Sequence, residues 1–304
     1  MGSQSNLFNN LSAEKGLVLE IAPFTVRVQS SITSFIKTFS QLYSCYPLKA
    51  DDGFFSDFHI QIEKPLGLRR WLKPQVKFYF DGVAPFTPLP ISQAFPSFEW
   101  GLNWCVANHS YQYLIIHAAV VEKNGFAMIL PGNPGAGKST LCAALVTRGW
   151  RLLSDEMAII DLKTNELIPL VRPVSLKNES IDIIKGFSSD AFFGDRFLDT
   201  SKGVVAHMKA PMESVLSAKL RAKAAWVIFP QYVSGASTSF IEINKSKTVI
   251  ELAKNSFNYN ALGKKGFDSL CDVVQNSACF ELKYSCLENV ISMFDDLADN
   301  KLNA

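Results

Sequence analysis

The chain has 304 residues, 48% hydrophobic and 19% charged, so it is long enough for one large domain or two smaller ones with sizeable cores. Its 30 basic and 28 acidic residues leave a net charge of +2, which gives no electrostatic argument for a nucleic acid or an anionic membrane as a partner. Six cysteines without a C-x-x-C pair favour a reducing compartment. Since neither a signal-peptide pattern nor an apolar run of ~20 residues is found, we expect a cytoplasmic protein.

The first third of the chain predicts an α+β region. Residues 1–16 are polar, and we expect a flexible N-terminus there. Across residues 17–110, short apolar or alternating segments predict strands at 17–21, 25–29, 58–62 and 76–80. Apolar residues spaced by three and four predict helices near residues 32–43 and 91–108.

Two apolar strands come next, at residues 113–121 and 126–130, and the Asn-Gly pair between them predicts a hairpin. The second strand leads directly into residues 132–140, GNPGAGKST, which fit the pattern G-x-x-x-x-G-K-[ST]. An apolar, helix-forming segment follows at 141–146. This strand–loop–helix context is the one that a phosphate-binding P-loop requires, and it makes a chance glycine turn a poor alternative.

The residue types of the loop match this chemistry. Glycines let the backbone turn sharply and bring its N–H groups close to phosphate oxygens, and the next helix points its positive end at the same anion. The Lys138 ammonium would reach the β- and γ-phosphates, and the Ser139 hydroxyl would ligate Mg²⁺. ATP and Mg²⁺ are therefore the predicted cofactors, bound by Gly132, Asn133, Pro134, Gly135, Ala136, Gly137, Lys138, Ser139 and Thr140.

An acidic pair, Asp155-Glu156, stands 17 positions after Lys138, at the end of an apolar β segment. Two adjacent carboxylates near Mg²⁺ and the γ-phosphate can divide the work, one holding the metal and the other accepting the proton of the attacking hydroxyl. The alternative is an exposed turn with two solvated acids. Apolar residues on both sides of the pair favour the functional interpretation.

His117 lies within the apolar strand 113–121. A lone histidine in such a strand is more often a packed core residue than a catalyst, although at the strand's end it would face the phosphates. Three basic residues could place positive charge beside the transferred phosphoryl group, namely Arg172, Lys177 and Lys202. Taken alone, each is more often a surface charge. Lys202 falls in the polar, glycine-containing stretch 187–212, which predicts a long loop or lid.

Together these motifs resemble the catalytic domain of HPr kinase/phosphorylase: a histidine before an Asn-Gly hairpin, then the P-loop, then R-G-W-x-L-x-S-D-E. The chain is most similar to the HPr-kinase-related kinase A group, from about residue 17 to the C-terminus, through the phrases AFPSFEWGLNWC, LIIHAAVVE, RPVSLKN, DTSKGVVAHM and NSFNYNALG. The arginine-rich R-P-G-R-N stretch of the parent family is missing; the nearest residues, 244–248, read NKSKT.

The resemblance implies a P-loop kinase core of the HPr kinase/phosphoenolpyruvate carboxykinase type over residues 111–304, with a mixed sheet. It implies that Asp155 is the general base, Glu156 its neighbouring acid on the metal side, and His117 an active-site histidine. The implied reaction is transfer of the ATP γ-phosphoryl group to a serine or threonine hydroxyl of a peptide or protein. A kinase for a metabolite or sugar alcohol, or a nucleotide-gated scaffold, remains open, as does self-association.

Overall fold

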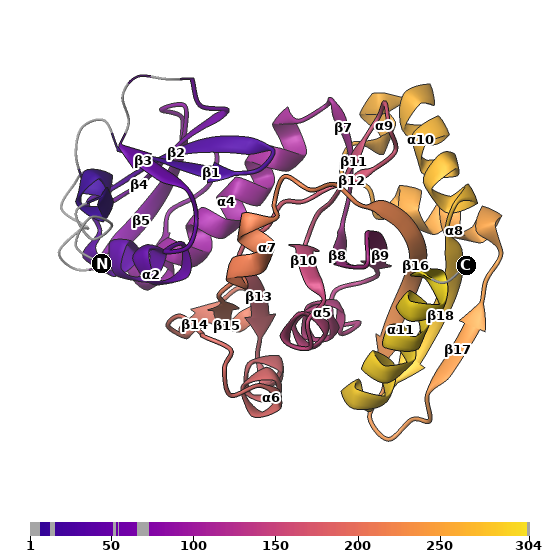
Figure 1. Ribbon diagram of the computed structural model, residues 1–304. Coiled ribbons are helices and arrows are strands. Elements are labelled where there is room, and N and C mark those ends of the chain that lie inside the picture. The colour runs from indigo at the N-terminus through magenta and orange to yellow at the C-terminus, as the bar shows by residue number, and fades with distance from the viewer. Residues whose placement is uncertain (1–6, 13–15, 51–52, 54, 66–72, 303–304) are drawn as a thin grey trace. The chain divides into compact units, whose positions relative to one another are not determined.

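The computed structural model describes residues 7–12, 16–50, 53, 55–65 and 73–302 (Figure 1). These residues form two compact units. The first contains the chain up to His109 together with 175–181 and 192–209, and the second contains 110–174, 182–191 and 210–304. The division is thus discontinuous along the chain, unlike the predicted regions 17–110 and 111–304. Residues 1–6 and 13–15 of the predicted flexible N-terminus lie outside the described residues, so that flexibility stays a prediction.

The first unit is built on a six-stranded mixed sheet in the order β3-β1-β2-β4-β5-β6. Every second residue of β2 and β4 is buried, because η1 packs against β2 and α4 packs against β4 and β5, with α2 packed against α4. The elements are η1 (Asn9–Ser12), β1 (Leu17–Ile21), β2 (Phe24–Ser30), α2 (Thr33–Leu42), β3 (Leu48–Ala50), β4 (Phe58–Glu63), β5 (Gln75–Phe80), β6 (Leu89–Pro90), η2 (Ile91–Gln93) and α4 (Ala94–His109).

The stretch 187–212 is not the long loop or lid that its composition predicts. It contains the hairpin of β14 (Phe197–Thr200) and β15 (Gly203–Met208), which joins β13 (Val174–Lys177) in a three-stranded sheet. The Thr200 hydroxyl donates to the carbonyl of Gly203 at 2.6 Å, and Gly203 takes a left-handed φ of 82° to close the turn. The prediction was wrong because it gave more weight to the polar turn residues than to the apolar residues after them, which form β15. Helices α6 (Glu179–Phe187) and α7 (Met212–Leu216) flank the hairpin in sequence.

The second unit is organised by a six-stranded sheet in the order β10-β8-β9-β16-β18-β17. The central strands β9, β16 and β18 are parallel, whereas β8, β10 and β17 pair antiparallel with their neighbours. A mixed α/β fold with mixed sheets, as expected, is therefore confirmed. The strands are β8 (Ala118–Lys123), β9 (Phe126–Pro131), β10 (Arg151–Ser154), β16 (Lys223–Tyr232), β17 (Ser239–Glu242) and β18 (Ala278–Tyr284), with β7 (Tyr113–Ile116), β11 (Ala158–Asp161) and β12 (Leu167–Ile168) in a smaller sheet.

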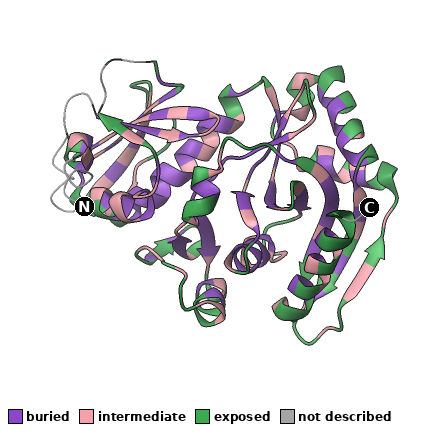
Figure 2. Cartoon of the chain, in the orientation of Figure 1, coloured by how far each residue is buried: buried purple, intermediate pink, exposed green. Residues whose placement is uncertain are grey.

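Helices pack on this sheet through its apolar residues, so the central strands are buried over most of their length (Figure 2). Leu252 of α8 and Leu270 of α10 share one hydrophobic cluster with strand residues such as Val120 and Val227. The helices are α5 (Lys138–Thr147), α8 (Lys245–Lys254), α9 (Tyr259–Leu262), α10 (Lys264–Gln275) and α11 (Leu287–Leu302). Within the described part of the chain, no helix combines the length and apolar character needed to cross a membrane.

Candidate nucleotide and phosphoryl-transfer site

Strand direction in the second unit brings the predicted residues to one edge of the sheet. Strand β8 is antiparallel to both β9 and β10, so the carboxyl ends of β9 and β10 lie beside the start of β8. Ala118 pairs with Pro131, and Ser154 pairs with Val120. His117, the glycine-rich loop and Asp155 are the next residues along these strands, which places them together at this carboxyl edge.

His117 marks a break that the sequence did not predict. The expected strand 113–121 is two strands: β7 pairs with β11, and β8 pairs with β9 and β10. The chain changes sheets at His117, which is partly buried and donates its backbone N–H to the carbonyl of Asn255 at 2.8 Å. His117 is therefore a strand-end residue at the edge and does not sit inside the core of an uninterrupted strand.

The glycine-rich loop, residues 132–137, joins β9 to α5. Gly132, Gly135 and Gly137 have φ values of 149°, 88° and 91°, conformations that residues with a Cβ rarely adopt. The loop is also fixed from outside, because the backbone N–H of Tyr232 donates to the carbonyl of Ala136 at 3.1 Å. Asn133, Pro134 and Gly135 are exposed, so the loop backbone is accessible to a ligand.

Lys138 is the first residue of α5 and is only 8% exposed. Its Nζ donates to the carbonyls of Gly132 at 2.6 Å and Asn133 at 3.2 Å, so the ammonium is held across the mouth of the loop. Ser139 and Thr140 follow in the first helical turn and are partly exposed. The N–H groups of a first helical turn point out of the helix end, and they add partial positive charge beside the ammonium.

The acidic pair lies in the tight turn between β10 and β11, where the Met157 N–H donates to the Ser154 hydroxyl at 3.0 Å. Asp155 is 7% exposed, and Glu156 is partly exposed. Burial, reinforced by the nearby Asp155 carboxylate, raises the pKa of the Cys142 thiol well above its usual value. Since Cys142 lies in the second turn of α5, Asp155 is close to the helix that begins at Lys138.

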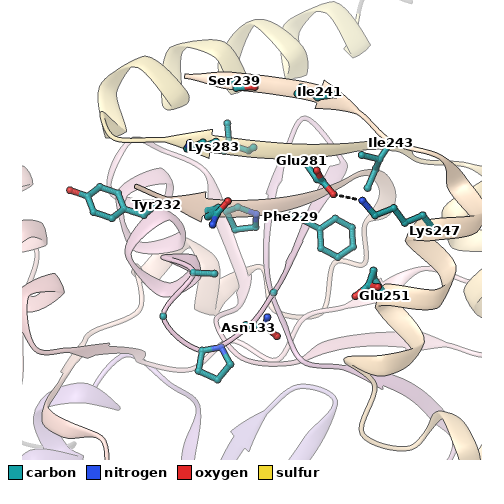
Figure 3. Close-up of a pocket in the computed structure, with 17 residues that line it drawn as sticks. Asn133, Phe229, Tyr232, Ser239, Ile241, Ile243, Lys247, Glu251, Glu281 and Lys283 are labelled. Atoms are coloured by element: carbon teal, nitrogen blue, oxygen red, sulfur yellow. Dashed lines mark hydrogen bonds and ion pairs between the residues drawn. The ribbon is translucent and has the colours of Figure 1, made fainter. Parts of the chain in front are cut away.

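A cavity of about 670 Å³ adjoins the loop on the side of β16 and β18. Figure 3 shows Asn133 on one side of it and strand residues such as Tyr232 and Lys283 on the other. At one end, Lys247 of α8 forms an ion pair with Glu281 at 2.7 Å. The remaining walls include Phe229 and Ile243, so the cavity is partly apolar and partly charged. Its size suits a nucleotide-sized ligand.

Sequence reasoning missed Tyr232 and Tyr284, which shape the loop from the ends of β16 and β18. The Tyr284 hydroxyl lies 3.4 Å from the carbonyl of Gly137. A Cβ on Gly137 would come within 2.8 Å of that hydroxyl and 3.2 Å of the Cβ of Tyr232, so only glycine fits. The available signal was position, because ligands of α/β sheets bind beyond the carboxyl ends of the strands.

The three basic candidates occupy different surroundings. Arg172, in the second unit, follows β12 and is 8% exposed, so it is not a surface charge. Lys177 and Lys202 belong to the first unit. Lys202 is exposed at the β14–β15 turn, with its Nζ 5.0 Å from the centre of the Trp100 ring.

A preformed metal cage is absent from the described residues, where no three His, Cys, Asp or Glu side chains group closely enough to hold an ion. Mg²⁺ that arrives with a nucleotide needs few protein ligands, because phosphate and water oxygens fill most of its coordination sphere. The Ser139 hydroxyl and the Asp155 and Glu156 carboxylates offer the hard oxygen ligands that Mg²⁺ prefers. The donor set at this edge therefore fits such an ion.

Comparison with known proteins gives one sequence relative of note. The chain is 34% identical over 71 residues to HPr kinase/phosphorylase from Prosthecochloris aestuarii, a match that spans 23% of this chain and 19% of that protein. The solved Hpr(Ser) kinase/phosphatase from Coxiella burnetii is 14% identical, covering 62% of this chain and 95% of that one, but a TM-score of 0.29 is too low for a comparison of folds. No family model matches the sequence. The sequence match, which spans about a fifth of that relative, carries the family name of the predicted resemblance.

Proposed function

We propose that the protein is an ATP- and Mg²⁺-dependent kinase that transfers the γ-phosphoryl group of ATP to a serine or threonine hydroxyl of a peptide or protein. The observation that carries the proposal is the meeting of three features at one sheet edge. These are the glycine-rich loop after β9, the buried Asp155 after β10, and His117 before β8. The sequence match to an HPr kinase/phosphorylase supports the same reaction class.

The loop acts as a P-loop in this proposal. Its backbone N–H groups and the first turn of α5 bind the phosphates, and Lys138 turns its ammonium from the loop carbonyls to the β- and γ-phosphates. The cavity beside β16 and β18 accepts the nucleoside part of ATP. Ser139 and Glu156 would hold Mg²⁺, which would neutralise charge on the phosphate oxygens.

Asp155 is the general base. A carboxylate at the end of β10 accepts the proton of the acceptor hydroxyl as that oxygen attacks phosphorus and the bond to the ADP leaving group breaks. His117, at the neighbouring strand end, contacts the acceptor as it approaches this edge. Arg172, in the same unit as the loop, remains a candidate for a cation that reaches the transferred group, and Lys177 and Lys202 stay predictions, each to be tested by substitution.

The proposal is tested by incubating the protein with γ-labelled ATP and a cell extract and identifying the labelled species. A labelled polypeptide that is absent with Asp155→Asn and with Lys138→Ala is the expected result. A labelled small molecule would indicate a metabolite kinase. ATP binding without any labelled product would indicate a scaffold.

A further inference from the structure

A short segment after α8, residues 255–258, is hydrogen-bonded to β7 and to His117 at the carboxyl edge. The carbonyl of Asn255 accepts the His117 N–H, and the Phe257 N–H donates to the carbonyl of Ile115 at 2.9 Å. The side chain of Asn258, which is 4% exposed, accepts from the N–H of Ile115 at 3.0 Å and donates to the carbonyl of Tyr113 at 2.8 Å. The backbone of this segment is therefore held in one position against β7.

Phe257 projects from this fixed backbone and is 49% exposed. The centre of its ring lies 5.7 Å from the centre of the His117 imidazole. Half of a large apolar side chain thus faces solvent directly beside a residue of the proposed active site. A partner that covers it gains apolar burial without a loss of backbone freedom in this segment.

The strand order indicates what passes over Phe257. The cavity adjoins β16 and β18 on one side of the loop, whereas Asp155 and His117 stand at β10 and β8 on the other. A nucleotide whose base fills the cavity therefore directs its terminal phosphate toward β8 and β10. The acceptor hydroxyl must approach from that second side, where Phe257 lies.

We propose that Phe257 is a specificity-determining residue that packs against an apolar side chain next to the phosphorylated serine or threonine of a peptide acceptor. This inference rests on the proposed kinase function and adds a selectivity that the reaction itself does not require. The neighbouring Asn258 acts as a positioning residue, since it fixes the backbone from which Phe257 projects.

The test uses the full-length protein, labelled ATP and a degenerate peptide library with a central serine or threonine. The wild type should enrich an apolar residue at one position close to the hydroxyl residue. Phe257→Ala should erase this enrichment and raise KM for the best peptide about tenfold, with a smaller effect on kcat, because the lost contact is apolar burial. Phe257→Glu should instead enrich lysine or arginine at the same position.

Phe267→Ala is the matched control, since Phe267 is 47% exposed but lies on α10, and this variant should select the same peptides as the wild type. Unchanged selection in Phe257→Ala, with transfer that still depends on Asp155, would overturn this inference and leave the kinase proposal intact. Failure of the wild type to label any peptide would also overturn it. Failure to label any species, in the library or in a cell extract, would overturn both proposals.

Discussion

The two edges of the large sheet in the second unit differ in the surroundings of their charged residues. At the carboxyl edge, Lys138 and Asp155 are 8% and 7% exposed beside a loop of left-handed glycines. At the opposite edge, a cavity of about 400 Å³ is lined by charged residues that are themselves exposed, including Lys223, Asp272 and Lys301. Solvated charges cost little, whereas buried ones reduce stability unless they are compensated. At the opposite edge the buried Glu122 is paired with Arg151, whereas at the carboxyl edge the buried charges stand beside an exposed loop backbone, so the carboxyl edge is the better candidate site.

Among substitutions that test the difference between the two edges, Lys138→Ala should lower activity the most. Loss of the ammonium at the loop mouth should lower ATP turnover at least about a hundredfold, the scale on which removal of a charge-stabilising donor slows catalysis. Lys223→Ala, at the opposite edge, is the control and should retain wild-type turnover. Turnover and ATP affinity of both variants, measured by coupled assay and calorimetry, check the prediction.

A smaller effect is expected from Gly137→Ala. Gly137 and Gly149 have nearly the same left-handed φ, 91° and 93°, but only Gly137 has neighbours that a Cβ would meet. Backbone strain should reduce the free energy of unfolding by about 1 kcal/mol in both variants, and by more in Gly137→Ala, because its Cβ would also meet Tyr232 and Tyr284. Gly137→Ala alone should also weaken ATP binding, by roughly tenfold as the loop shifts. Equal ATP affinity in the two variants would contradict the role assigned to the loop.

Much of the carboxyl edge could be predicted from the sequence because its signals are local. The pattern of residues 132–140 specifies its own conformation, and Asp155 follows an apolar strand closely in sequence. The contribution of Tyr232 and Tyr284 depends on the parallel pairing of β16 with β9 and β18, which is set by packing of distant segments. The break at His117 likewise depends on a hydrogen bond from residue 255, far along the chain.

Tyr284→Phe should have a still smaller effect. The carbonyl of Gly137 already accepts from the Leu141 N–H at 2.9 Å, so loss of the longer contact with the Tyr284 hydroxyl leaves it with a partner. Burial raises the pKa of Tyr284, so the phenol stays neutral through the physiological range. ATP affinity should fall by no more than about threefold, and a titration of the variant against ATP measures it. A loss as large as that of Gly137→Ala would contradict this ranking.

Cys142 of the folded protein should not react with a thiol-alkylating reagent near pH 8. Because burial and the Asp155 carboxylate raise its pKa, the thiol stays protonated, and the thiolate is the reactive form. The exposed Cys286 should react first. Peptide mapping by mass spectrometry should find Cys142 modified only after denaturant is added, and early modification would show that this part of the edge opens.

Asp155 is proposed to take part in phosphoryl transfer and not in nucleotide binding, and two matched substitutions separate these roles. Asp155→Asn removes the carboxylate that follows β10, and Asp272→Asn removes a carboxylate of α10 that lines the cavity at the opposite edge. We expect both variants to bind ATP like the wild type, while phosphoryl transfer falls at least about a hundredfold in Asp155→Asn only. Transfer at the wild-type rate in Asp155→Asn would show that Asp155 is not the general base.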